Sequence, residues 1–309
     1  MTERGSHGPA HDPVSVLVAQ LKHGNATTRR QAVRALAAAG PAAAGPLALL
    51  LMDGDADAPA RAQAVALLGQ LGDAARHAVP ALIATLKEAE INVRCEALAV
   101  LGALGDVRAV PGVIAVLGDV QAEVRQQAAA ALGALGDARA VEPLLVLLGR
   151  DRDEGVRHKA AEALGRLGDA RAVLPLIAQV ESRLPLAPVA AAAQALGRIA
   201  ERNPVPELRA ALPALRSRSQ NEYDFGGPFP SPVYQIAVRQ IETATAAFQD
   251  LPLPAAPNES AANLPVPAAA PGPATKDLPL PATANSGDDK PPARGWWTRL
   301  KAVARGRLG

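Results

Sequence analysis

One hexapeptide that recurs at even spacing constrains this chain more than any other feature. The sequence GDARAV stands at residues 136–141 and again at 168–173, and a near copy, GDVRAV, stands at 105–110. The copies begin 31 and 32 residues apart. A fixed period of roughly 20 to 50 residues is typical of stacked repeats, in which each unit buries its apolar face against its neighbours. The repetition therefore predicts an array of similar units.

The hexapeptide belongs to a longer unit, in which VR is followed by ALGxLGD, then by RAV and PLI or a close variant. Clear copies begin at Val93, Val124 and Val156. Looser copies occupy residues 60–83 and 28–50, and a degenerate one occupies 189–215. About six units are therefore expected before the pattern ends.

Each unit is predicted to fold as two helices joined at the GD dipeptide. In VRQQAAAALGAL, residues 124–135, apolar side chains recur at three- and four-residue steps and give one apolar stripe. Gly136 stands where a helix ends in a residue with positive φ, and Asp137 is placed to cap the next helix through its carboxylate. The sequence thus predicts one sharp corner in each unit.

The second helix of the unit is expected over ARAVEPLLVLLG, residues 138–149. Its predicted core side chains are Val141, Leu144, Leu145 and Leu148. Pro143 falls within the first two turns and is expected to bend this helix locally, because proline removes a backbone donor.

The VR, ALGxLGD, RAV and PLI segments resemble the HEAT repeat, specifically the bacterial phycobilisome-lyase-type HEAT-like repeat, over roughly residues 14–216. The resemblance implies an all-α fold, an armadillo-like α-solenoid (superhelix) of about six helical hairpins. It also implies structural polar ladders between units. The residues at the ladder positions are Asp106, Asp137, Asp169, Arg94, Arg125 and Arg157.

Composition agrees with a thin helical stack. Aromatic residues make up 2% of the chain, and all seven lie after residue 220, so alanine and aliphatic side chains must pack the repeats. The net charge is +2 and Cys95 is the single cysteine, which excludes an internal disulfide and indicates a reducing compartment. No apolar leader is visible and the apolar runs are short. A soluble, cytoplasmic protein is expected.

The resembled family also contains enzymes, so an enzymatic function is the alternative to a scaffold. A di-iron hydroxylase would need recurring His-Glu pairs, and none of the five histidines is followed by Glu. A bilin lyase would be expected to offer aromatic contacts, which the repeats lack. Cys95 occupies a position held by Gln126 and His158 in other units, with no base aligned beside it. We therefore expect no catalytic residues, metal or cofactor, while a lyase-like or oxidoreductase-like activity stays the alternative.

Nucleic acid is not an expected partner. Arg29, Arg30, Arg34 and Arg61 make the first units mildly basic, but Asp53, Asp55 and Asp57 lie close by. Tracking phosphates would need a longer basic stripe than this.

Residues 217–234, SRSQNEYDFGGPFPSPVY, interrupt the repeats and gather four of the seven aromatics. Two interpretations stay open. The segment covers the apolar edge of the last unit, with the following helix VYQIAVRQIETATAAF closing the stack. Alternatively, Tyr223, Phe225 and Phe229 contact a partner, since aromatic side chains are enriched at interface hot spots.

The C-terminal part has a different composition. Residues 250–293 are rich in proline and alanine and contain no aromatic, which predicts a disordered linker. Residues 294–309, RGWWTRLKAVARGRLG, carry five basic residues and no acid. A basic amphipathic segment with tryptophan suits an anionic membrane surface or a groove on a partner. The predicted anchor residues are Trp296, Trp297, Arg299, Leu300, Lys301 and Arg305.

The sequence thus predicts four parts: a flexible N-terminus (1–12), the capped repeat domain (13–249), the linker (250–293) and the basic tail (294–309). The expected function is a non-enzymatic scaffold or adaptor that binds another protein, with the tail localising it, including at the inner face of the membrane. The concave face and its second helices are expected to bind the partner. The proposed partner-facing residues are Thr85, Val116, Leu147 and Gln179. The oligomeric state is left open.

Overall fold

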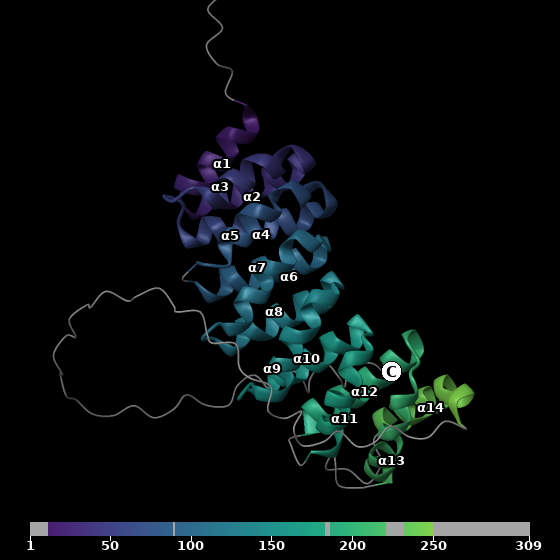
Figure 1. The fold of residues 1–309 in the computed structure, drawn as a ribbon. Coiled ribbons are helices and arrows are strands. Elements are labelled where there is room, and N and C mark those ends of the chain that lie inside the picture. Colours follow the sequence, from purple (N-terminus) through teal and green to yellow (C-terminus); the bar gives the residue numbers. More distant parts are fainter. Residues whose placement is uncertain (1–11, 89, 183–185, 221–231, 250–309) are drawn as a thin grey trace, which may run out of the picture. The chain divides into compact units, whose positions relative to one another are not determined.

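The computed structural model describes residues 12–88, 90–182, 186–220 and 232–249, and these segments are built from helices and short connections with no strand among them (Figure 1). The predicted α-solenoid is confirmed. Of the predicted N-terminal part only Asp12 is described, and the linker and the basic tail lie outside the described residues. The α-helices are α1 (Pro13–His23), α2 (Ala26–Ala39), α3 (Ala44–Met52), α4 (Ala58–Leu71), α5 (Val79–Thr85), α6 (Ile91–Leu104), α7 (Val110–Ala115), α8 (Ala122–Leu135), α9 (Val141–Arg150), α10 (Glu154–Leu167), α11 (Val173–Glu181), α12 (Leu186–Arg202), α13 (Leu212–Gln220) and α14 (Pro232–Thr245).

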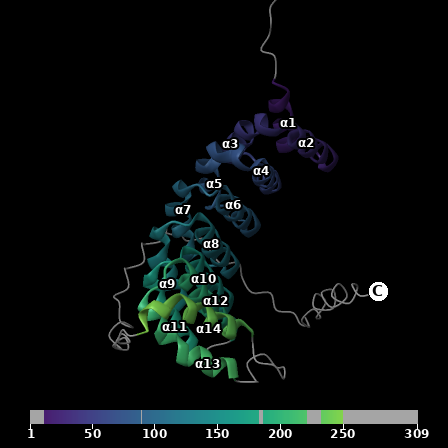
Figure 2. The ribbon, with the colours of Figure 1, turned by 90° about the vertical axis from the view of Figure 1, so that its right-hand side faces the viewer.

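The helices alternate between two rows (Figure 2). The row of first helices contains α2, α4, α6, α8, α10 and α12, each packed on the next. The row of second helices runs from α1 through α3, α5, α7, α9 and α11 to α13. Six hairpins result, from α2–α3 to α12–α13, which agrees with the number of repeats in the sequence. The closing helix α14 packs on both α12 and α13.

The corner of each hairpin forms as the GD dipeptide predicts. Gly136 ends α8 with φ of 70°, and the Asp137 carboxylate accepts a 2.8 Å hydrogen bond from the Arg139 backbone N–H. A 3₁₀ turn at Ala138–Ala140 then leads into α9. The 3₁₀ turn therefore ends before Val141, and Pro143 lies in the first turn of α9. The N–H that proline lacks needs no helical partner there. The local bend at Pro143 stays a prediction.

The first helices approach one another closely at glycines. A Cβ placed on Gly133 of α8 would stand 2.8 Å from Ala163 Cα of α10, and one on Gly165 would stand 2.7 Å from Ala195 Cα of α12. Gly102 meets Ala131 in the same way, with its Cβ position 3.1 Å from the Ala131 Cα. The first glycine of each ALGxLGD unit is thus a contact point between consecutive hairpins.

One stretch of the described chain, Ala26–Met52, is long and apolar enough to cross a membrane by those criteria alone. It consists of α2, a 3₁₀ turn and α3. Gly40, with φ of 59°, separates the two α-helices, which lie in different rows. The stretch is therefore the first hairpin of the repeat array.

Candidate functional site

The residues predicted to face a partner do not form one exposed row. Thr85 is only 1% exposed and its hydroxyl donates to the Ala81 carbonyl at 2.9 Å, while Leu147 is 8% exposed. The prediction is wrong for these two side chains. Both follow a buried leucine by three residues, Leu82 and Leu144, and residues three apart share one side of a helix. Val116 and Gln179 are half-buried.

The exposed residues of the second helices form an outward row. In each helix, the residue of this row stands two positions after a buried core residue such as Leu82 or Leu144. The row contains Leu49, Ala84, Ala115, Val146 and Ala178, one from each of α3, α5, α7, α9 and α11. Leu49 is 70% exposed and Val146 is 52% exposed, and Met52 at the end of α3 is 67% exposed. We call this surface the second-helix face. It carries no charge along its central row.

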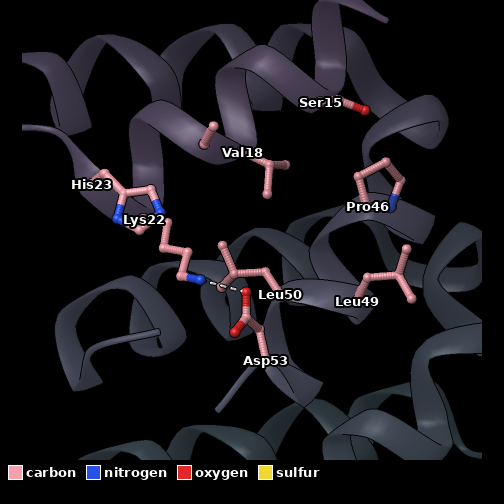
Figure 3. A pocket seen from close by; sticks show the side chains of 9 residues that line it. Ser15, Val18, Lys22, His23, Pro46, Leu49, Leu50 and Asp53 are labelled. Atoms are coloured by element: carbon pink, nitrogen blue, oxygen red, sulfur yellow. Dashed lines mark hydrogen bonds and ion pairs between the residues drawn. The ribbon is translucent and has the colours of Figure 1, made fainter. Parts of the chain in front are cut away.

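A pocket of about 350 Å³ opens on this face between α1 and α3. Figure 3 shows Val18 and Leu50 across its centre, with Ser15 and Pro46 at one end. At the other end Lys22 Nζ lies 2.6 Å from Asp53 Oδ2 (Figure 3). The hydrogen bond from Lys22 lowers the pKa of Asp53, so this carboxylate stays charged and neutralised by its lysine. The pocket combines apolar walls with a paired polar rim.

A second pocket, of about 270 Å³, lies between α5 and α7. Ile83, Leu86 and Val116 form apolar parts of its lining, and Lys87 and Asp119 stand at its rim. Arg94 of the first-helix row holds Asp119, with Nη2 3.1 Å from Oδ1. Val116, from the predicted partner-facing set, thus lines this pocket on the second-helix face.

Arginines at the start of the first helices connect consecutive hairpins. Arg125 donates to both oxygens of Asp151, at 2.7 Å from Nε and 2.9 Å from Nη2. Burial alone would raise the pKa of Asp151, but the hydrogen bonds from Arg125 and from the Asp153 N–H outweigh it, and the pKa is lowered. The corresponding pairs are Arg29–Asp57, Arg61–Glu88, Arg94–Asp119 and Arg125–Asp151.

Arg157 has a different set of contacts within the described residues. It is 9% exposed, and its Nη1 donates to the carbonyls of Asp151 and Arg152 at 2.8 and 3.2 Å. It therefore holds the loop that precedes its own helix, as Arg125 also does through the Asp119 carbonyl at 2.9 Å.

A second polar ladder runs along the corners. Arg139 pairs with Asp137 at 2.8 Å, and its Nη2 also donates to the Val107 carbonyl of the preceding corner at 3.1 Å. Arg108 pairs with Asp106 at 2.6 Å, and Arg171 with Asp169 at 2.8 Å. The predicted ladder residues therefore belong to two ladders at opposite ends of the first helices, and the aspartates are held by the RAV arginines.

The corner arginines affect the titration of these aspartates. The hydrogen bonds from the Arg108 side chain and backbone lower the pKa of Asp106 to about 2. The equivalent bonds from Arg139 lower the pKa of Asp137 to about 2. These carboxylates form structural ion pairs and stay ionised near neutral pH, so they are poor candidates for acid–base chemistry there.

The other predicted sites add no chemistry to this picture. Burial raises the pKa of the Cys95 thiol, the opposite of an activated nucleophile. The described residues contain no group of three or more His, Cys, Asp or Glu side chains arranged to hold a metal. Tyr223, Phe225 and Phe229 lie outside the described residues, as do the predicted tail residues Trp296, Trp297, Arg299, Leu300, Lys301 and Arg305.

A family model for HEAT repeats matches residues 46–121 and 110–186. Residues 46–186 of this chain are HEAT repeats. The predicted family is confirmed by these matches together with the two-row packing of the hairpins. No curated protein matches the sequence of this HEAT-repeat protein significantly.

Solved structures with the same arrangement include the YibA protein of Escherichia coli, at 17% identity and a TM-score of 0.52 over 74% of this chain and 81% of that one. An engineered protein aligns at 22% identity and a TM-score of 0.51, over 75% of this chain and 68% of the other. The CpcE–CpcF complex of phycocyanin lyase from Nostoc aligns at 23% identity and 0.44, over 81% and 95%. At these identities the likenesses to YibA and to the engineered protein concern the fold alone.

Proposed function

We propose that this HEAT-repeat protein is a non-enzymatic scaffold that binds another protein through its second-helix face. The observation that carries the proposal is the exposure of large apolar side chains beside a pocket, with Leu49 70% exposed and Met52 67% exposed. Burying one such side chain at an interface is worth about 1.5 to 3 kcal/mol. Contiguous exposed apolar side chains of this kind are typical of protein interaction sites.

The opposite row of helices, from α2 to α12, presents a more polar surface, which we call the first-helix face. Its exposed positions include polar and charged residues along successive helices, such as Gln31, Glu96, Gln127 and Arg166. The second-helix face has its charged groups at the helix ends and an apolar row in between. A protein partner with apolar side chains therefore matches the second helices better.

Site-specific photo-cross-linking in a native lysate tests the proposal. A photoreactive residue at Met52 is expected to give a defined adduct with one protein, and the added substitution Leu49→Glu is expected to remove it. The matched control carries the photoreactive residue at Ala103, exposed on the first-helix face. Equal adducts at both positions, or an adduct that survives Leu49→Glu, would contradict the proposed binding surface.

Residues 294–309 are proposed, from the sequence, to localise the scaffold. Their five basic residues and two tryptophans suit an anionic membrane surface at the inner face of the cell membrane. This role is separate from the second-helix face and has its own test below.

A further inference from the structure

The two pockets of the second-helix face occupy the same place in the repeat. In each, an apolar residue of the first of two neighbouring second helices is followed four positions later by a lysine. These are Val18 and Lys22 within α1, and Ile83 in α5 with Lys87 two residues after the end of that helix. The following helix contributes an outward-row residue to each pocket, Leu49 or Ala115. The two pockets therefore repeat one arrangement of side chains along this face.

The next residue along the chain is also equivalent in the two pockets: Leu50 of α3 in one, and Val116, directly after α7, in the other. Each pocket also ends at an aspartate, Asp53 or Asp119, three positions further along the chain. The repeat therefore builds the apolar wall and the polar rim of both pockets from the same positions.

The spacing of the pockets follows from the helix rows. One pocket lies between α1 and α3 and the other between α5 and α7, so they are two helices apart along the same row. Neighbouring helices pack about 8 to 10 Å apart, which places the pockets roughly 16 to 20 Å from each other. A single ligand segment of moderate length can therefore fill both pockets.

The charges at the rims favour an acidic ligand. Asp53 is paired with Lys22 at 2.6 Å, and Asp119 is held by Arg94 at 3.1 Å, so neither carboxylate offers free negative charge. Lys87, by contrast, is exposed and forms no ion pair with any described residue. The uncompensated charge next to the α5–α7 pocket is thus positive.

From this placement we infer that the partner of the second-helix face is a peptide segment with two large apolar side chains, which enter the α1–α3 and α5–α7 pockets together. An acidic residue next to the second apolar side chain pairs with Lys87. This inference rests on the proposed function and adds the chemistry of the segment that binds. Bridging two sites makes the second contact intramolecular, which strengthens binding beyond that of either pocket alone.

Selection of displayed random 16-residue peptides on the full chain tests the inference. A peptide of this length spans the pockets even as a helix, at 1.5 Å per residue. Affinities of the selected peptides are then measured for the wild-type chain and for Leu49→Glu, Ala115→Glu, Lys87→Glu and Ala66→Glu. The last variant is the matched control, since Ala66 is exposed on the first helix α4, outside the second-helix face, and lines neither pocket.

We expect Leu49→Glu and Ala115→Glu each to weaken binding by about tenfold or more. Lys87→Glu should weaken it by about two- to fivefold, the range of an exposed ion pair. Ala66→Glu should leave binding within about twofold, the effect of a neutral surface position. Thermal unfolding of each variant confirms that the fold is intact.

Peptides that respond to only one pocket variant would overturn the two-pocket inference while leaving protein binding on this face standing. Peptides that respond to Ala66→Glu but to neither pocket variant would contradict the proposed function as well. Peptides that respond to none of the four variants would contradict both the inference and the proposed function. Failure to select any peptide would also overturn the two-pocket inference.

Discussion

Arg125 and Asp151 form a two-bond ion pair that joins one hairpin to the loop before the next, with nitrogen–oxygen distances of 2.7 and 2.9 Å. The Arg125 side chain is 16% exposed and the Asp151 side chain 7% exposed. A guanidinium placed in this way also donates to the Asp119 carbonyl, so one side chain fixes two loops. The same arrangement recurs along the stack, which makes these arginines part of the coupling between repeats.

Replacing Arg125 with alanine is expected to lower the free energy of unfolding by about 2 to 3 kcal/mol, because a mostly buried carboxylate and a loop carbonyl lose charge-assisted hydrogen bonds. Chemical denaturation measures the change. The control is Arg139→Ala, whose side chain is 56% exposed, and which should lower the free energy of unfolding clearly less than Arg125→Ala. Equal losses for the two variants would contradict a special role for Arg125.

Replacing Gly133 with alanine is expected to destabilise the stack by about 1 to 3 kcal/mol, because the added methyl group would meet the backbone of Ala163. Gly149→Ala in α9 is the matched control, since a Cβ there meets nothing within 4 Å. Alanine has the higher helix propensity, so the control should be neutral or slightly stabilising. The two melting temperatures distinguish close packing from propensity, and a stabilising Gly133→Ala would refute the close contact.

Acid is expected to destabilise the corners. The pKa of Asp106 and of Asp137 is about 2 in the folded chain, below the ordinary 3.8. Between about pH 4 and pH 2 the unfolded chain binds protons that the folded carboxylates do not, so the free energy of unfolding falls as the pH falls. The Asp106→Asn, Asp137→Asn double variant keeps capping side chains but loses these charges. Its stability should depend less steeply on pH in this window, and an unchanged slope would contradict the assignment.

The basic tail is expected to bind vesicles that contain anionic lipid. The fraction of the full chain that sediments with such vesicles should fall as salt is added. The reason is that salt screens the attraction between the basic side chains of residues 294–309 and the charged surface. The double substitution Trp296→Ala, Trp297→Ala should remove most of the binding, while neutral vesicles should bind little in either case. Binding that ignores both salt and the tryptophans would contradict a membrane role for the tail.

The architecture was predictable because a Gly-Asp dipeptide marks the turn between the two helices in each clear copy of the repeat. Gly136 and Asp137 take the conformations that their chemistry favours, and the same dipeptide recurs at each strong copy. The first glycine of the motif, Gly133 in one copy, was not interpreted from the sequence. A glycine that recurs inside a helical pattern despite its low propensity is the signal that would have revealed a packing contact.

The partner-facing residues were predicted less well, for a reason of register. Each second helix begins as a 3₁₀ turn, with about three residues per turn, and only then becomes α-helical. The outward row therefore contains Ala84 and Val146, and the neighbouring Thr85 and Leu147 point into the stack. The ion pairs between hairpins were not predicted, although the sequence contains a signal for them. An acidic residue stands 25 to 28 positions after each of the arginines that join consecutive hairpins, from Arg29 to Arg125.

The most direct test of the central claim, that the second-helix face binds a protein, is quantitative affinity capture from native lysate with the full chain and its variants. Leu49→Glu is expected to lose a protein that the wild type captures. Ala66→Glu, an exposed first-helix position, should retain it. A chain ending after residue 249 should also retain it, because the face lies within the repeats. Capture that persists in Leu49→Glu but disappears with the tail would contradict the claim and assign recognition to residues 250–309.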